Sequence, residues 1–217
     1  MKNTQSGFTL VEIAIVLVII GLLLGGVLKG QELINSAKAK AAVNDFRNTM
    51  TMIAAYQDRY RALPGDDPSA QSHLGSTATQ AAGNVGNGLI DGAWDSTAAT
   101  DESVIMWQHL RLANLATGDA TAPGTDIDKW VPRNSDGGRI GVSRTRPSGL
   151  QNAINGRQFI CQGNINGRIA QQIDSTMDDG NPATGSVGAF ISDASTKSST
   201  STGNFDESAS YTVCYGF

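Results

Sequence analysis

An apolar run from Phe8 to Leu28 that holds a single charged residue, Glu12, constrains this chain more than any other part of its sequence. The run has 21 residues, and a helix needs about 20 residues to cross the hydrocarbon core of a bilayer. A carboxylate inside such a helix costs about 2.5–3.5 kcal/mol on insertion scales, so Glu12 is a candidate functional residue. Because a hydrophilic leader ends at Gly7, a cut at that point would retain the apolar run, whereas secretory signals are cut after their apolar core.

The order of these residues resembles the class III signal of type IV pilins and of the related pseudopilins of type II secretion. The sequence reads GFTLVEIAIVLVIIGLLL after a short leader that carries Lys2, so the resemblance covers about the first thirty residues. It implies that a prepilin peptidase/methyltransferase cuts the chain after Gly7 and N-methylates Phe8. It also implies that Glu12 neutralises the amino terminus of a neighbouring subunit and sets the axial register during filament assembly.

The resemblance further implies where the protein resides and what it contacts. The precursor would be a single-pass protein of the bacterial inner membrane, and its partners would be the peptidase, copies of itself and other pilin-like subunits. The filament would be an extracellular pilus or a periplasmic pseudopilus. A minor, tip-located subunit that binds a surface, a sugar or DNA is the alternative. On the residues alone, a plain signal anchor and a secretory signal cut near residues 37–39 stay open.

The remaining sequence predicts an α+β fold, pilin-like, in which a long N-terminal helix packs on a small antiparallel sheet. Residues 31–63 contain no proline, and Val43, Phe46, Met50 and Ile53 form an apolar stripe at helical spacing. The stripe predicts that a transmembrane half of the helix continues into an amphipathic half, which stops at Pro64. The expected parts are a leader (1–7), a transmembrane and assembly helix (8–30), an amphipathic spine (31–63) and a globular head (64–217).

Within the head, the patterns predict two more helices, four strands and one long loop. Residues 103–115 are expected to form an amphipathic helix, and residues 164–177 a helix capped by Asn164. Residues 69–100 are rich in small residues and are expected to form a surface excursion. The expected strands are 139–144, 158–161, 187–192 and 210–215.

Cys161 and Cys214 are the only cysteines of the chain. An even number of cysteines in an exported head indicates one disulfide, which would contribute about 4 kcal/mol in the chain-entropy model. Two buried free thiols are the alternative. The pair lies where the resemblance to pilins places a disulfide-bounded C-terminal region.

The net charge of −4 excludes a globally basic nucleic-acid binder, but the charges are segregated along the head. Residues 62–128 hold nine acids and one base, residues 129–168 hold seven bases and one acid, and the rest holds six acids and one base. Contacts between these segments, within or between subunits, are the preferred interpretation. No nucleic acid is expected, and a DNA-binding strip is the weaker alternative.

Catalytic chemistry has little support, because the two histidines, His73 and His109, lack neighbours at ligand or catalytic spacing. The chain is therefore not expected to be an enzyme and needs no cofactor, with calcium as the one ligand to consider. One candidate is the EF-hand-like run NGLID at residues 87–91, which is short of carboxylates. The other is the group Asp174, Asp178 and Asp179, where pairing with an arginine is preferred to calcium.

Three tryptophans are expected to be core residues, with a carbohydrate platform as the alternative: Trp94, Trp107 and Trp130.

Overall fold

The computed structural model describes residues 9–151, 154–192 and 203–217. The chain divides into two compact units, one that ends at Ala37 and one from Lys38 to Phe217. Helix α1 (Leu10–Tyr60) belongs to both units and is unbroken, which confirms a long N-terminal helix. It ends where Arg61 adopts a positive φ of 56°, shortly before Pro64, which cannot continue a helix.

In the first unit, the large apolar side chains of α1 from Leu10 to Ile34 are all exposed, with exposed fractions of 46–90%. An 18-residue window of this helix has a mean hydropathy of 2.8, and the helix is long and apolar enough to cross a membrane. The glycines of this part, at positions 21, 25, 26 and 30, do not interrupt the helix.

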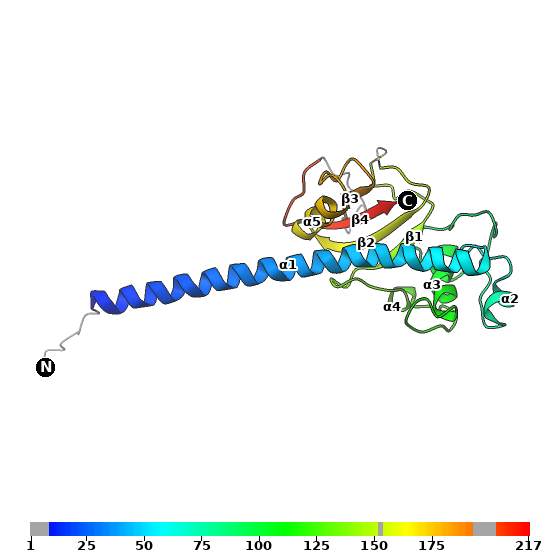
Figure 1. The fold of residues 1–217 in the computed structure, drawn as a ribbon, viewed down its shortest axis with the longest axis horizontal. Helices are drawn as coiled ribbons and strands as arrows, with labels where there is room; N and C mark the ends of the chain where they lie inside the picture. Colours follow the sequence, from blue (N-terminus) through cyan, green and yellow to red (C-terminus); the bar gives the residue numbers. More distant parts are fainter. Residues whose placement is uncertain (1–8, 152–153, 193–202) are drawn as a thin grey trace. The chain divides into compact units, whose positions relative to one another are not determined.

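In the second unit, four antiparallel strands form one sheet beside the C-terminal half of α1 (Figure 1). The strand order is β1-β2-β4-β3. The two central strands, β2 and β4, are therefore not consecutive in the sequence, because β3 lies between them along the chain. Together with α1, the sheet confirms the predicted α+β architecture. The strands are β1 (Ile140–Ser143), β2 (Phe159–Asn166), β3 (Val187–Ile191) and β4 (Ser210–Gly216).

The main core lies between one face of this sheet and the apolar stripe of α1. Val43, Phe46 and Ile53 of the stripe are buried in one cluster with sheet residues such as Ile160 and Val213. Because apolar burial is the main favourable term in folding, this stripe fixes the second half of α1 against the sheet.

Four short or medium helices complete the second unit. Helix α3 was predicted to be amphipathic, but its residues from Glu102 to Arg111 are all buried. Segments before and after it provide the cover, since Gln108 donates to the carbonyl oxygens of Thr77 and Ala120. The helices are α2 (Ala70–Leu74), α3 (Glu102–Leu112), α4 (Ile127–Trp130) and α5 (Gly167–Met177).

The predicted start of the 164–177 helix is wrong. Asn164 and Ile165 belong to β2, which extends to Asn166 and pairs there with Ser210 of β4. The N-cap of α5 is Asn166, whose side chain accepts a hydrogen bond from the amide of Arg168. Cross-strand pairing therefore outweighs the helical spacing of the isoleucines, and the sequence of the helix alone does not contain that information.

Residues 69–100 form a tethered segment instead of a free surface excursion. The segment contains helix α2, and Ala70, Ala78, Ala81 and Ile90 are buried. Ser103 donates its amide to the carbonyl oxygen of Asp91, which fastens the end of the segment to α3.

Candidate functional site

The N-terminus of α1 is closed by a reciprocal pair of hydrogen bonds between Thr9 and Glu12. The amide and the hydroxyl of Thr9 donate to Oε2 of Glu12 at 2.8 and 2.7 Å, and the amide of Glu12 donates to Oγ1 of Thr9 at 3.3 Å. This geometry is a capping box, in which a Thr at the N-cap and a Glu three residues later satisfy free backbone donors. Oε1 of Glu12 accepts no hydrogen bond from the part of the chain that the structure describes.

Sequence reasoning identified Glu12 from its charge but missed this second role. The spacing Thr-x-x-Glu before an apolar run is itself the signal of a capping box. Gly7 and Phe8, the expected cleavage and methylation residues, lie outside the described residues. The assignment of both positions, and of Glu12 as the assembly residue, therefore stays a prediction.

Cys161 and Cys214 form a disulfide, which confirms that prediction and excludes two free thiols. The two residues face each other in the register of β2 and β4, with a Cα–Cα distance of 4.1 Å. They lie on the sheet face opposite α1, in a second cluster with Leu150, Ile154 and Phe159. The bond therefore joins the two central strands and links two residues that are 53 positions apart in the sequence.

Ion pairs connect the basic segment of the head to both acidic segments. Arg139 lies 3.3 Å from Asp128, and Arg168 lies 2.6 Å from Glu207. A third pair joins Arg144 to Asp91. These pairs confirm complementary contacts within the subunit for these arginines.

The loop with the EF-hand-like sequence surrounds an internal carboxylate. The amides of Gly86, Asn87 and Gly88 all donate to the carboxylate of Asp66, at 3.1 Å from Asn87 and 2.7 Å from Gly88. Calcium requires oxygen ligands, whereas these N–H groups create a site for a negative charge. Asp91, the last residue of the run, pairs with Arg144 instead.

The carboxylates of Asp174, Asp178 and Asp179 also have protein partners, and these are mostly backbone amides instead of the expected arginine. Asp174 accepts from the amide of Gly180 at 2.9 Å, and Asp178 from the amide of Val187 at 2.9 Å. Asp179 accepts from the amide of Asn181 and the hydroxyl of Thr184. Within the described ranges, no group of three or more His, Cys, Asp or Glu side chains could hold a metal ion. Calcium binding stays a prediction that these contacts do not support.

His109 has a structural role. It is fully buried, its Nδ1 accepts from the amide of Gly65 at 3.0 Å, and its Nε2 lies 2.9 Å from the carbonyl oxygen of Thr79. Burial lowers the pKa of His109, so the neutral ring donates from Nε2 and accepts at Nδ1. His73 stacks on Tyr60 and contacts the buried Asp67 at 2.7 Å.

Comparison with known families supports the interpretation of the N-terminal segment. Residues 2–28 match the family model of the prokaryotic N-terminal methylation motif. Neither the curated proteins nor the solved structures give a match to the chain. The apolar N-terminal helix and the motif fit a membrane-anchored precursor. The match supports a type IV pilin-like prepilin with a class III signal.

Proposed function

We propose that this protein is a structural subunit of a type IV pilus or of a type II secretion-like pseudopilus. The precursor is cut after Gly7, methylated at Phe8 and assembled through α1. The observation that carries the proposal is the apolar surface of α1 from Leu10 to Leu28, which is exposed along its length and carries a carboxylate in its first turn. A large apolar side chain gains about 1.5–3 kcal/mol when it leaves water, so this surface needs a bilayer or other subunits around it.

Glu12 supplies the specific contact that apolar packing lacks. Lipid tails are as apolar as leucine, so apolar surface alone does not draw helices together inside a membrane. The capping box orients the Glu12 carboxylate with Oε2 bound, and Oε1 accepts no hydrogen bond from the described residues. A cut after Gly7 creates a positive amine at Phe8, and the amine of a neighbouring subunit can then pair with Oε1. In an apolar environment such a pair is far stronger than in water, which fixes the axial register.

The test compares Glu12→Gln with Glu32→Gln in the native host. Glu32 lies on the same helix, is exposed and pairs with Lys29 at 2.8 Å, so it is a matched control outside the apolar run. We expect Glu12→Gln to insert into the membrane and to be cut after Gly7, as shown by mass spectrometry of the mature chain. The amount of this variant in sheared filaments should fall at least tenfold, while Glu32→Gln assembles normally.

Three outcomes would contradict the proposal. A normal filament yield from Glu12→Gln would remove the proposed role of its carboxylate. A wild-type chain that still begins at Met1 would indicate a plain signal anchor, and one that begins after Ala39 would indicate a secreted protein.

A minor, tip-located subunit that acts as a binding module is the second candidate. A hollow on the outer face of the sheet favours it. DNA has less support as the ligand, because Arg139 is buried and Arg144 and Arg168 are paired with carboxylates.

A further inference from the structure

Among the residues that the structure describes, only one half of the outer face of the sheet, opposite α1, is covered. Side chains of alternate residues point to the same face of a sheet, so this face carries Cys161 of β2, Cys214 of β4 and the strand positions two residues away. Over the disulfide, Leu150 and Ile154 form the second core cluster. Gly188 lies under them, and a Cβ there would come within 2.6 Å of Ile154.

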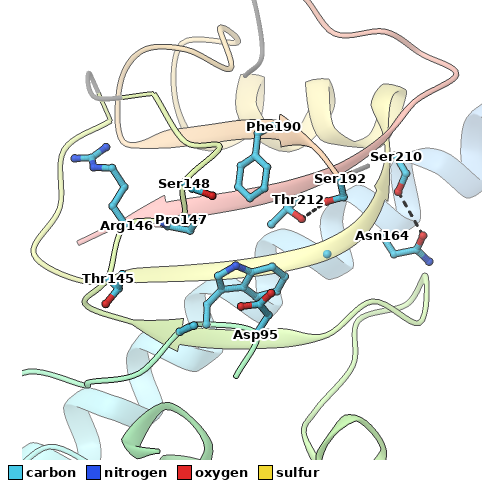
Figure 2. A pocket seen from close by; sticks show the side chains of 13 residues that line it. Asp95, Thr145, Arg146, Pro147, Ser148, Asn164, Phe190, Ser192, Ser210 and Thr212 are labelled. Atoms are coloured by element: carbon cyan, nitrogen blue, oxygen red, sulfur yellow. Dashed lines mark hydrogen bonds between the residues drawn. The ribbon is translucent and has the colours of Figure 1, made fainter. Parts of the chain in front are cut away.

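The other half of this face is hollow. Its floor is the row formed by Gly163 of β2, Thr212 of β4 and Phe190 of β3, and the next row holds Ser210 and Ser192 (Figure 2). Because these positions hold mainly small side chains, they leave a cavity of about 770 Å³. Pockets that bind small molecules have volumes of about 300–1,000 Å³.

Trp94 forms one wall of the cavity, and two glycines fix its position. A Cβ at Gly163 would lie 3.4 Å from Cη2 of the indole, and a Cβ at Gly141 would collide with the carbonyl oxygen of Trp94. Trp94 is half-buried, whereas Trp107 is almost fully buried and Trp130 lies under the guanidinium of Arg111 at 4.3 Å. Of the three tryptophans, Trp94 is therefore the one whose ring borders a cavity on this face.

Polar groups surround the aromatic wall. Asp95 also lines the cavity (Figure 2), and none of the described residues donates a hydrogen bond to its carboxylate. At the opposite rim, Asn164, Ser192 and Ser210 are exposed. The Ser192 hydroxyl lies 2.5 Å from that of Thr212. The Ser210 hydroxyl donates to Oδ1 of Asn164 at 3.4 Å, and the amide nitrogen of Asn164 donates to the carbonyl oxygen of Asp136 at 2.7 Å.

We propose that this cavity binds a carbohydrate. One face of a sugar ring presents C–H groups that pack on the negative π-face of an aromatic ring, and Trp94 supplies that surface. The ring hydroxyls both donate and accept, which suits the carboxylate of Asp95 and the hydroxyl groups of the rim. This inference concerns the head alone and does not depend on the proposed assembly through α1.

The experiment uses the full chain in a polyoxyethylene detergent, because a maltoside or glucoside detergent would compete for the site. The protein is applied to an array of neutral and acidic oligosaccharides, and the best-bound sugar is then titrated while tryptophan fluorescence is recorded. We expect saturable binding with a change in emission that Trp94→Phe abolishes. Asp95→Asn should weaken binding about tenfold or more, because a hydrogen bond to a charged group contributes about 1.5–3 kcal/mol.

Asp58→Asn is the matched control, since Asp58 is 86% exposed on α1 and far from the cavity in sequence. It should bind the sugar as the wild type does. All variants should keep the wild-type melting temperature, which separates a lost contact from a lost fold. The proposal is overturned if no sugar binds, or if binding survives in both Asp95→Asn and Trp94→Phe. Binding lost equally in Asp58→Asn would overturn it as well.

Discussion

At the scale of single residues, Asp174 is the carboxyl group whose surroundings change its chemistry most clearly. Its side chain is fully buried at the end of α5, and Oδ2 has no partner among the described residues. Burial raises the pKa of Asp174 to about 7, and the nearby carboxylates of Asp179 and Asp178 act in the same direction. The amide of Gly180 opposes the increase in pKa only in part.

The raised pKa of Asp174 makes the stability of the head depend on pH. Between the unfolded pKa near 3.8 and the folded pKa of about 7, the folded state holds a proton that the unfolded state has lost. The free energy of unfolding therefore falls as pH rises through this window and levels off above it. Between pH 5 and pH 8, the free energy of unfolding of the wild type should fall by on the order of 2 kcal/mol more than that of Asp174→Asn. Denaturant unfolding at both pH values measures this difference.

Asp206 provides the matched control, because the hydroxyl and the amide of Ser208 lower its pKa and it is not among the groups that shift the pKa of Asp174. It stays ionised from pH 5 to pH 8, so Asp206→Asn should show the same pH dependence as the wild type. An identical pH dependence in Asp174→Asn and the wild type would contradict the assignment to Asp174.

At the scale of elements, the sequence predicts what depends on local pattern and misses what depends on distant partners. Helix α1 was predicted because propensity, apolar spacing and a proline stop all agree along it. The N-terminus of α5 was misplaced because β4, more than forty residues further on, extends β2 to Asn166. The burial of α3 was missed for the same reason. So was the carboxylate that the loop of residues 86–91 surrounds, since Asp66 lies 20 residues before Gly86.

The candidate site shows the same division. Glu12 and the disulfide were predicted from charge and count, which are local or compositional signals. The hollow could not be predicted, because its floor combines Gly163, Phe190 and Thr212 from three strands. Trp94 enters it from a loop whose path depends on close approach to Gly141.

A substitution of Asp66 would test whether this carboxylate holds the loop of residues 86–91 in place. It is 2% exposed and accepts three backbone amides. An Asn at this position keeps one acceptor oxygen and introduces two donors that face those amides. We expect Asp66→Asn to lower the free energy of unfolding by about 1–3 kcal/mol per amide left unpaired. Hydrogen exchange at Gly86, Asn87 and Gly88 should become faster.

Asp58→Asn, an exposed change in α1, should leave both the stability and these exchange rates as they are. If calcium held the loop instead of Asp66, added EDTA would increase the same exchange rates in the wild type. We expect EDTA to have no effect there, and a clear effect would revive the EF-hand-like interpretation.

At the scale of the whole molecule, the sequence separates two functions between two units. The unit from Lys38 to Phe217 contains the sheet, both core clusters and the disulfide. The residues before it supply the matched motif and the exposed apolar part of α1. The proposed role as a membrane-anchored filament subunit needs both parts, but the physical chemistry of each part is different.

A chain that begins at Lys38 should therefore fold without a membrane. The buried residues of α1 start at Ala39, so this truncation removes none of the core. We expect a monomer that is soluble without detergent, with the Cys161–Cys214 bond formed and the near-UV circular dichroism of the full chain. The new helix end lacks its cap, which costs about 1 kcal/mol.

A chain that begins at Thr51 is the control: it lacks the buried Phe46, whose loss alone costs about 3–5 kcal/mol, and should not fold. Aggregation of the Lys38 chain with its disulfide unformed would show that the head depends on the apolar segment.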